Sequence, residues 1–335
     1  MTPIAEYQGV DEARFRSEIE PLARPAVLRG LVRHWPAVAQ ACQSPAAFCR
    51  YLGTFDNGQP VDAILLPPRE KGRIFYNEAM DGFNFARNRV PLSAIVDQLS
   101  RYAHFDEPPS VAVQSTPIPD CLPGFVAQNP LPLLDPSVVP RLWMGNRVIV
   151  PAHFDESQNV ACVVAGRRRF TLFPPEQIGN LYIGPLDHAP TGTPISMVDL
   201  AAPDLERHPR FAQALAAAQV AELEPGDALF IPTLWWHHVA SLDRRLNVLV
   251  NYWWKGSLGA VDSTASVFGS LLHAMLHVRS LPPELRRAWQ AVFVHYVFDA
   301  DPAEHIPAPH RGLLGPLTPE RAEQLRQRLI ATLQR

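Results

Sequence analysis

Short runs in which apolar and polar residues alternate dominate the middle of the chain, from Ser110 to about residue 254. A period of two places every second side chain on the same face of a sheet and therefore predicts half-buried strands. Proline and glycine separate the runs, as in Pro225-Gly226-Asp227, and Ala165-Gly166 predicts a hairpin. The predicted strands lie near 110–114, 147–150, 159–164, 169–173, 221–223, 228–231, 238–242 and 246–254. Such a series of short strands with tight turns favours a sandwich or jelly roll.

The N-terminal part of the chain mixes helical and extended patterns. Asp11 is an N-cap candidate, and Ser44 precedes a proline at the first position of a second predicted helix. Apolar residues at helical spacing predict a third helix over 91–99. Short strands are predicted at 25–30, 61–66 and 73–76, and a further helix in the 174–219 insert begins near Pro209.

The C-terminal part, after Gly259, is helical. An apolar stripe with spacings of three and four continues from one predicted helix into a second that starts at Pro283, and Thr318 caps a third. Its residues are Val267, Phe268, Leu271, Leu272, Met275, Leu276, Trp289, Val292 and Phe293. We predict that the stripe forms a homodimer, while packing on the protein's own β core is the alternative.

Composition limits the possible functions. Apolar residues make up 47% and charged residues 19% of 335 residues, which is typical of a chain that folds throughout. Thirty Lys and Arg against 33 Asp and Glu leave a net charge of -3, so a phosphate-binding surface is disfavoured. The four cysteines form no CxxC pair, and no leader or apolar run of about 20 residues is present. We therefore expect a reduced, cytoplasmic protein without a membrane span.

A histidine and a carboxylate follow directly on an apolar strand, at His153 and Asp155. If the strand continues, these residues share one face and project together into the space inside the sheet. His237 and His238 begin another strand and offer a second imidazole. Two imidazoles and one carboxylate on one face of iron form the site of non-haem Fe(II) oxygenases. A lone His-x-Asp also occurs on solvated loops, and paired histidines can simply pack in a core.

About a third of the chain, between residues 143 and 255, resembles the cupin-like JmjC hydroxylases. That group includes the asparaginyl hydroxylase of hypoxia-inducible factor and the wybutosine-tRNA hydroxylase. The resemblance implies a double-stranded β-helix that binds Fe(II) and uses 2-oxoglutarate as co-substrate. The matching runs are Pro151-Ala-His-Phe-Asp-Glu-Ser-Gln-Asn159, Gly166-Arg-Arg-Arg-Phe-Thr-Leu-Phe-Pro-Pro-Glu-Gln177, Pro225-Gly-Asp-Ala-Leu-Phe-Ile-Pro-Thr-Leu-Trp-Trp-His-His238 and Val250-Asn-Tyr-Trp-Trp-Lys255.

The resemblance assigns the metal to three residues and places two amides beside it. It implies that His153, Asp155 and His237 bind Fe(II), while His238 faces outward. Asn159 and Asn251 would then lie beside the end of 2-oxoglutarate next to the metal, where an amide can donate. Of four nearby tryptophans, alternation predicts that half line the mouth of the site and half are core. They are Trp235, Trp236, Trp253 and Trp254.

Arg168 stands where the family commonly has the lysine that pairs with the distal carboxylate of 2-oxoglutarate. A guanidinium is always charged and can pair with a carboxylate bidentately, so the chemistry can survive. The alternative is that residues 167–169 solvate a hairpin, although alternation predicts that one of the three arginines points inward. Val150 and Ala112 are apolar where some members supply hydroxyl groups, so binding of the co-substrate would depend more on Arg168.

We therefore predict a mainly β protein with α additions and three regions. These are an N-terminal α/β elaboration (1–105), a jelly-roll catalytic core (106–258) and a helical, dimerising extension (259–335). The resemblance implies hydroxylation, with 2-oxoglutarate converted to succinate and carbon dioxide. A protein or peptide side chain is the expected substrate, and the acidic balance makes tRNA less favoured. A cupin-like metalloenzyme that needs no 2-oxoglutarate and a non-catalytic binding module remain open.

Overall fold

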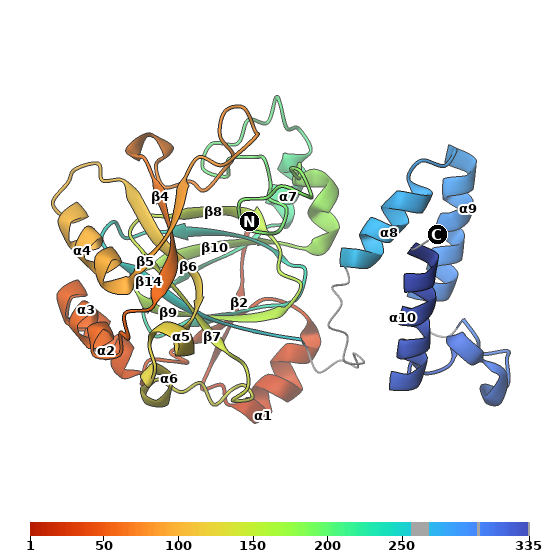
Figure 1. Cartoon of the computed structure of the whole chain (residues 1–335), viewed down its shortest axis with the longest axis horizontal. Coiled ribbons are helices and arrows are strands. Elements are labelled where there is room, and N and C mark those ends of the chain that lie inside the picture. The colour runs from red at the N-terminus through yellow and green to blue at the C-terminus, as the bar shows by residue number, and fades with distance from the viewer. Residues whose placement is uncertain (256–267, 300–301, 334–335) are drawn as a thin grey trace. The chain divides into compact units, whose positions relative to one another are not determined.

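The computed structural model describes residues 1–255, 268–299 and 302–333 (Figure 1). The chain divides into two compact units, 1–254 and 255–335. Val267 and the predicted boundary at 258–259 lie outside the described residues. Among the described residues no helix has both the length and the apolar character needed to cross a membrane.

The first unit contains two β-sheets, and the chain crosses repeatedly between them from β7 to β14. The smaller sheet has the order β1 (Thr2–Pro3), β11 (Gln219–Leu223), β10 (Arg168–Phe173), β13 (Trp236–Ser241) and β8 (Ile149–His153). The larger sheet has the order β2 (Ala5–Gln8), β3 (Ala26–Arg29), β12 (Ala228–Ile231), β9 (Gln158–Ala165), β14 (Asn247–Trp254), β7 (Pro140–Gly145), β6 (Ser110–Pro117), β4 (Pro60–Leu66) and β5 (Ala86–Pro91). The strand pairs within the described residues are antiparallel apart from β1–β11 and β2–β3.

The two sheets face each other across an apolar core. Alternate residues of β9, such as Ala161 and Val163, pack in one cluster with Phe170 and Leu172 of β10 and Val239 of β13. Because β9 belongs to one sheet and β10 and β13 to the other, this cluster fills the space between them. The predicted mainly β jelly roll with helical additions is confirmed.

The predicted hairpin at Ala165-Gly166 is wrong. The turn does join β9 to β10, but these strands lie in different sheets, so the turn carries the chain across the sandwich. Gly166 has φ +70°, and a Cβ there would lie 2.5 Å from Oδ1 of Asn247. Glycine is therefore required both by the backbone conformation and by the close approach of β14.

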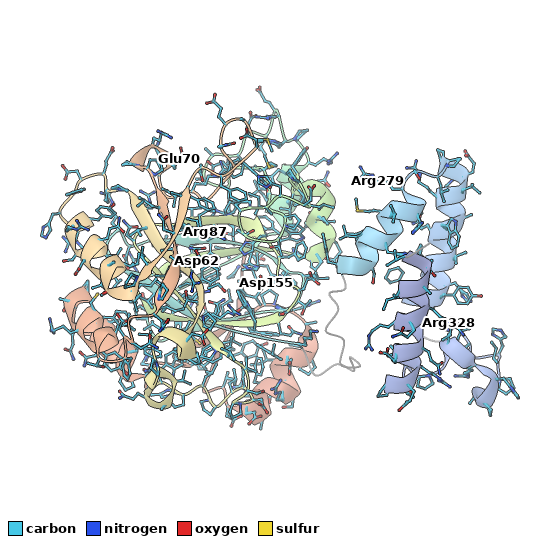
Figure 2. All side chains as sticks on the ribbon, viewed as in Figure 1. Asp62, Glu70, Arg87, Asp155, Arg279 and Arg328 are labelled. Carbon is cyan, nitrogen blue, oxygen red and sulfur yellow. The ribbon has the colours of Figure 1, made fainter. Side chains whose placement is uncertain are left out.

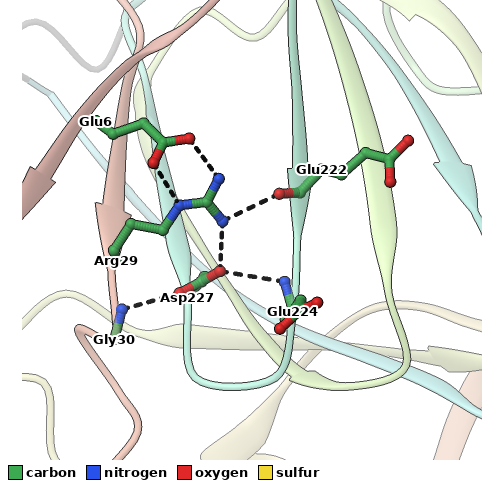
Figure 3. A network of polar contacts seen from close by, with 6 residues as sticks. All are labelled: Glu6, Arg29, Gly30, Glu222, Glu224 and Asp227. Carbon is green, nitrogen blue, oxygen red and sulfur yellow. Dashed lines mark hydrogen bonds and ion pairs between the residues drawn. The ribbon is translucent and has the colours of Figure 1, made fainter.

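A second crossing, from β11 to β12, is fixed by an ion-pair network around Asp227 (Figure 3). This buried carboxylate accepts from Nη1 of Arg29 at 2.6 Å and from the backbone N–H groups of Gly30 at 2.9 Å and Glu224 at 3.2 Å. Arg29 also bonds Glu6, and these two acids raise the pKa of its guanidinium. The network therefore ties β2 and β3 to the turn that precedes β12.

Helices cover the outer face of the larger sheet. Apolar residues of α2 to α4, including Val38, Phe48 and Ile95, pack in one cluster with outward-facing strand residues such as Cys162 and Val250. Ser44 caps its helix as predicted, because its side chain accepts from the backbone N–H of Ala47 at 3.0 Å. The α-helices of the first unit as a whole are α1 (Glu12–Arg14), α2 (Pro36–Gln43), α3 (Pro45–Gly53), α4 (Leu92–Tyr102), α5 (Ile118–Cys121), α6 (Phe125–Gln128) and α7 (Phe211–Ala217).

The N-terminal strand predictions need one correction. Strands predicted at 25–30 and 61–66 exist as β3 and β4, but 73–76 forms only isolated bridges, from Arg73 to Ile149 and from Tyr76 to Phe83. This segment is apolar because it lies at the edge of β8, where the backbone N–H of Ile74 donates to the carbonyl of Ile149 and the Ile74 side chain is buried in a cluster with Ile64, Leu66, Ala112 and Val148. Burial in a loop therefore produced the apolar pattern of a strand.

The second unit is helical and buries few of its own side chains. Its helices are α8 (Phe268–Val278), α9 (Pro283–Phe293) and α10 (Pro319–Leu333), as predicted. Among its described residues only Ala303 and Ala322 are buried, while the side chains of Leu276 and Phe298 are 66% and 75% exposed.

Candidate metal centre and its cavity

Three side chains that can bind a metal converge where β8 and β13 lie side by side. His153 is the last residue of β8, and its register partner on β13 is His237. Asp155 follows two residues after the strand end, where its carbonyl accepts from the backbone N–H of Leu234 at 3.0 Å. The potential ligand atoms of the three side chains all lie within 4.8 Å of one another. The strand continues beyond the predicted 147–150 as far as His153 but not to Asp155, and Asp155 still lies beside both histidines.

Backbone carbonyls orient both imidazole rings. Nδ1 of His153 lies 2.9 Å from the carbonyl of Pro151, and Nδ1 of His237 lies 3.0 Å from that of Trp235. A carbonyl only accepts, so each Nδ1 carries the proton and each Nε2 keeps its lone pair for a metal. Nε2 of His237 is 3.6 Å from Oδ2 of Asp155, which places the lone pair next to the carboxylate.

Burial keeps His153 and His238 neutral. The pKa of His153 lies below its ordinary value, first because the ring is desolvated and then because His237 is adjacent. His238 points to the opposite face of β13, as predicted, and burial lowers its pKa to about 4. Neutral imidazole is the form that binds a metal, so His153 needs no deprotonation at pH 7.

The donor set fits a divalent transition metal such as Fe(II). It consists of two imidazole nitrogens and one carboxylate, which together occupy one face of an ion and leave other positions for further ligands. A closed structural zinc site would instead need four protein ligands. Within the described residues, no other group of three or more His, Cys, Asp or Glu side chains has this spacing.

The two predicted amides form a hydrogen-bonded chain that ends on the carboxylate. Nδ2 of Asn159 donates to Oδ2 of Asp155 at 3.2 Å, and Nδ2 of Asn251 donates to Oδ1 of Asn159 at 3.0 Å. Both amides are buried, and they come from the adjacent strands β9 and β14. The chain orients Asp155 and brings both amides next to the three candidate ligands.

Arg168 is the one arginine of the three that points inward. Its side chain is buried, whereas Arg167 and Arg169 are exposed and pair with Asp243 and Glu222. Arg168 has no carboxylate partner among the described residues, and its buried Nε has no acceptor. Desolvation lowers the pKa of the guanidinium to about 10, so it remains charged at pH 7. An unpaired buried cation is costly, and an anionic ligand would complete it.

The end of the site around Arg168 is apolar apart from one hydroxyl. Val150 lines the same cavity, and Ala112 is buried in a neighbouring apolar cluster, so neither supplies a hydroxyl. Ser241 lies directly opposite Arg168 in the pairing of β10 with β13. Its Oγ is buried without a hydrogen-bond partner. Sequence reasoning missed Ser241, because only the register of two strands brings it beside Arg168.

A single cavity of about 920 Å³ contains the metal-binding candidates and Arg168. Of the four tryptophans considered, only Trp253 lines it, while Trp235 and Trp236 are buried in the core and Trp254 packs beside Phe230. The cavity also extends to residues that sequence reasoning missed, on strands β7, β6, β4 and β5. Those that carry charge or an indole are Arg141, Trp143, Asp62, Arg87 and Arg89.

Comparison with known proteins supports one family. The model of the cupin-like domain family matches residues 12–259. Lysine-specific demethylase 8 of Xenopus tropicalis is 27% identical over 248 residues, 72% of this chain and 50% of the relative. The bifunctional peptidase and (3S)-lysyl hydroxylase JMJD7 of Homo sapiens is 27% identical over 69% of this chain and 77% of its own length. The tRNA wybutosine-synthesizing protein 5 of Danio rerio is 36% identical over 31% of this chain and 28% of its own length. The chain thus spans about half the length of the Xenopus relative.

Proposed function

The chain belongs to the cupin-like domain family, and from that membership we propose that it is an Fe(II)- and 2-oxoglutarate-dependent oxygenase that hydroxylates a protein side chain. Its relatives include JmjC-type oxygenases, which supports the oxygenase class. The observation that carries the co-substrate is a single cavity that holds both the His153, Asp155 and His237 cluster and the unpaired, buried Arg168.

The metal end of the cavity would be formed by three side chains and supported by two more. His153, Asp155 and His237 would hold Fe(II), which when bound supplies the site for 2-oxoglutarate and dioxygen. Asn159 keeps the carboxylate of Asp155 in place through its hydrogen bond, and Asn251 in turn orients Asn159. Because both Nδ1 atoms donate to carbonyls, the rings cannot rotate without losing these bonds.

Arg168 would bind the distal carboxylate of 2-oxoglutarate, with help from Ser241. On β10, Arg168 lies four residues from Leu172, the partner of His237, which corresponds to roughly 13 Å along a strand. An arginine side chain and a five-carbon diacid laid end to end can bridge that separation. The hydroxyl of Ser241 could donate to the same carboxylate, and it would thereby replace the hydroxyls that Val150 and Ala112 lack.

A protein substrate is favoured over tRNA. Two of the three relatives described above are named for action on lysine, one as a demethylase and one as a lysyl hydroxylase. The relative named for tRNA matches only 31% of this chain. A net charge of -3 also gives no overall attraction to a phosphate backbone.

Two other classes make different predictions about binding. A cupin-like metalloenzyme that needs no 2-oxoglutarate would bind iron through the same cluster but would not bind 2-oxoglutarate. A non-catalytic module would bind neither. We therefore propose to measure iron content and 2-oxoglutarate affinity without oxygen, for the wild type and for His153→Ala and Asp155→Ala.

The expected result is one iron per wild-type chain and none in either folded variant, because three ligands are the minimum for this site. Binding of 2-oxoglutarate should require the metal in the wild type. Undiminished iron in both variants would refute the metal assignment. Iron binding without 2-oxoglutarate binding would favour a cupin-like metalloenzyme that needs no 2-oxoglutarate.

We further propose that the chain forms a homodimer through residues 260–335. The support is the apolar stripe on α8 and α9, whose Leu271, Leu272 and Trp289 side chains are 46%, 50% and 46% exposed within a unit that has almost no core of its own. Light scattering at micromolar concentration should give twice the mass of one chain. A mass near that of one chain, or a dimer that persists without residues 260–335, would refute the proposal.

A further inference from the structure

One wall of the cavity has hydrogen-bond donors that lack acceptors. Nε1 of Trp143 and Nε1 of Trp253 are both buried, and neither has a hydrogen-bond partner in the described structure. The two rings lie edge to face with their centroids 6.2 Å apart, and Cζ of Arg141 lies 5.6 Å from the centroid of the Trp253 ring. All three side chains line the cavity. Indole and guanidinium groups only donate, so a ligand that completes this wall must offer acceptors.

The backbone of β6 holds Arg141 in position. Nη1 of Arg141 donates to the carbonyl of Ser115 at 2.7 Å and to its Oγ at 3.3 Å. Ser115 has φ +43°, in the left-handed region, and it lies where the register between β6 and β7 shifts. Bulges and left-handed non-glycine residues cost free energy and are enriched at functional sites. Here the bulge turns a carbonyl toward Arg141 and leaves Nε and Nη2 of the guanidinium for another partner.

The charges around Arg141 leave it without an acid. In the parts of the chain that the structure describes, Arg141 forms no ion pair. The other charged groups at this side of the cavity are Asp62, Arg87, Arg89 and Asp120. Oδ1 of Asp62 lies 3.6 Å from Nε of Arg87, and both residues are labelled in Figure 2. Arg89 donates to the carbonyl of Pro60. Three arginines therefore face two aspartates, and one of those aspartates is already paired.

Arg141 lies close to the metal centre. Its partner on β14 is Asn251, and β14 in turn pairs with β9, which carries Asn159. Two strand spacings separate β7 from β9, about 10 Å, and Asn159 bonds Asp155 directly. An extended peptide advances about 3.4 Å per residue. A group held by Arg141 would therefore lie within about three residues of the position that is oxidised.

We propose that the substrate is a peptide segment with an acidic side chain, which Arg141 and the two indole N–H groups bind beside the metal centre. This inference rests on the proposed oxygenase function, whose substrate class it specifies. A carboxylate matches the available donors because charge-assisted hydrogen bonds to guanidinium are the strongest that this wall can make. A net charge of -3 favours a peptide that carries a few carboxylates over a polyanionic nucleic acid as the source of the anion.

The test is a binding measurement with three pools of fluorescein-labelled random peptides. The pools have equal length and differ only in the residue fixed at every third position, which is Asp, Lys or Asn. The full chain is loaded with Mn(II) and 2-oxoglutarate without oxygen, and affinity is read by fluorescence anisotropy. The Asp pool should bind at least tenfold more tightly than the Lys pool, equivalent to ~1.4 kcal/mol.

Two variants and one control assign that preference to the wall. Arg141→Gln should weaken binding of the Asp pool about tenfold and leave the Asn pool unchanged. Trp253→Phe keeps an aromatic ring but removes the indole N–H and two ring carbons, so it should weaken the Asp pool about threefold even if Arg141→Gln is unstable. Arg87→Gln removes an arginine that is 54% exposed and already faces Asp62, and it should change affinity less than either.

Several outcomes would overturn the inference. They are equal affinity for the three pools, preference for the Lys pool or for an oligonucleotide, and unchanged Asp-pool affinity in Trp253→Phe and in folded Arg141→Gln. The proposed function is tested separately by succinate production in the wild type. Succinate without an acidic preference would refute this inference alone, whereas an acidic preference without succinate would refute the oxygenase.

Discussion

Replacing Arg168 with methionine should affect stability and binding in opposite directions. The guanidinium is buried without a counter-ion among the described residues, and desolvation lowers its pKa to about 10. A change of one in pKa corresponds to ~1.4 kcal/mol, so the buried charge costs the ligand-free protein on the order of 3 kcal/mol. Methionine fills a similar volume without charge. The ligand-free variant should therefore be more stable than the wild type.

The same substitution should strongly lower the affinity for 2-oxoglutarate. One hydrogen bond to a charged group contributes ~1.5–3 kcal/mol, which is about a 10- to 150-fold change in affinity. Differential scanning fluorimetry of the Mn(II)-loaded protein without oxygen measures both effects. The wild type should be stabilised by millimolar 2-oxoglutarate, and Arg168→Met should start from a higher midpoint and shift little.

Arg169→Met is the matched control, because Arg169 lies on the same strand but faces solvent and pairs with Glu222. It should leave the shift caused by 2-oxoglutarate unchanged. The reasoning would be refuted if Arg168→Met were less stable than the wild type without ligand, or if it kept the full shift.

Three further predictions concern stability and the hydroxyl at the co-substrate end. Asp227→Ala should lower the free energy of unfolding in urea by about 2–3 kcal/mol, because it leaves Arg29 and two backbone N–H groups without a buried acceptor. The control Glu222→Ala breaks an exposed ion pair and should lower it by under ~1 kcal/mol. Equal losses in the two variants would contradict this reasoning. Burial lowers the pKa of both His153 and His238 in the folded state, so the unfolded chain binds more protons below about pH 6.5. The free energy of unfolding of the metal-free protein should therefore be level above pH 7 and fall toward pH 5. A flat profile over that range would argue against buried neutral imidazoles. Ser241→Ala should weaken 2-oxoglutarate binding in calorimetry by about tenfold or less with little change in unfolding midpoint, whereas unchanged affinity would remove Ser241 from the site.

Much of the fold could be predicted from local patterns. Alternation identified most strands of the two sheets, and capping residues identified the helices at Ser44 and Pro319. Four strands escaped, and two of them, β1 and β2, are too short and too exposed to show an alternating pattern. β5 is an exposed edge strand whose residues Ala86 to Arg89 are all exposed, so no face has an apolar pattern. β7 alternates buried Leu142 and Met144 with half-buried Arg141 and Trp143, but it is only six residues long and is bounded by Pro140 and Gly145, which are typical of a loop.

Errors arose where long-range pairing decides what a local signal means. A glycine turn at Gly166 is equally compatible with a hairpin and with a crossing between sheets, and only the pairing of β9 with β14 and of β10 with β13 distinguishes them. The apolar segment at 73–76 is buried, but only an isolated bridge from Arg73 to Ile149 attaches it to the edge strand β8, so it does not form a strand. Neither outcome is encoded within a few residues.

The candidate site was predictable only in part for the same reason. His153 and Asp155 are neighbours in sequence, so a short motif reveals them, and resemblance to a family supplied His237 and Arg168. Arg141 lines the cavity from β7, where the carbonyl of Ser115 in a bulge of β6 holds its guanidinium. No motif in the sequence indicates that bulge.

Succinate production is the measurement that tests the central claim most directly. The purified full chain is supplied with Fe(II), 2-oxoglutarate, ascorbate and air, without any prime substrate, and compared with Asp155→Ala. The wild type should form succinate slowly but above the protein-free background, and the variant should form none, because Asp155 is one of the three proposed iron ligands. No succinate from iron-loaded wild type, or equal amounts from both proteins, would contradict the proposed oxygenase.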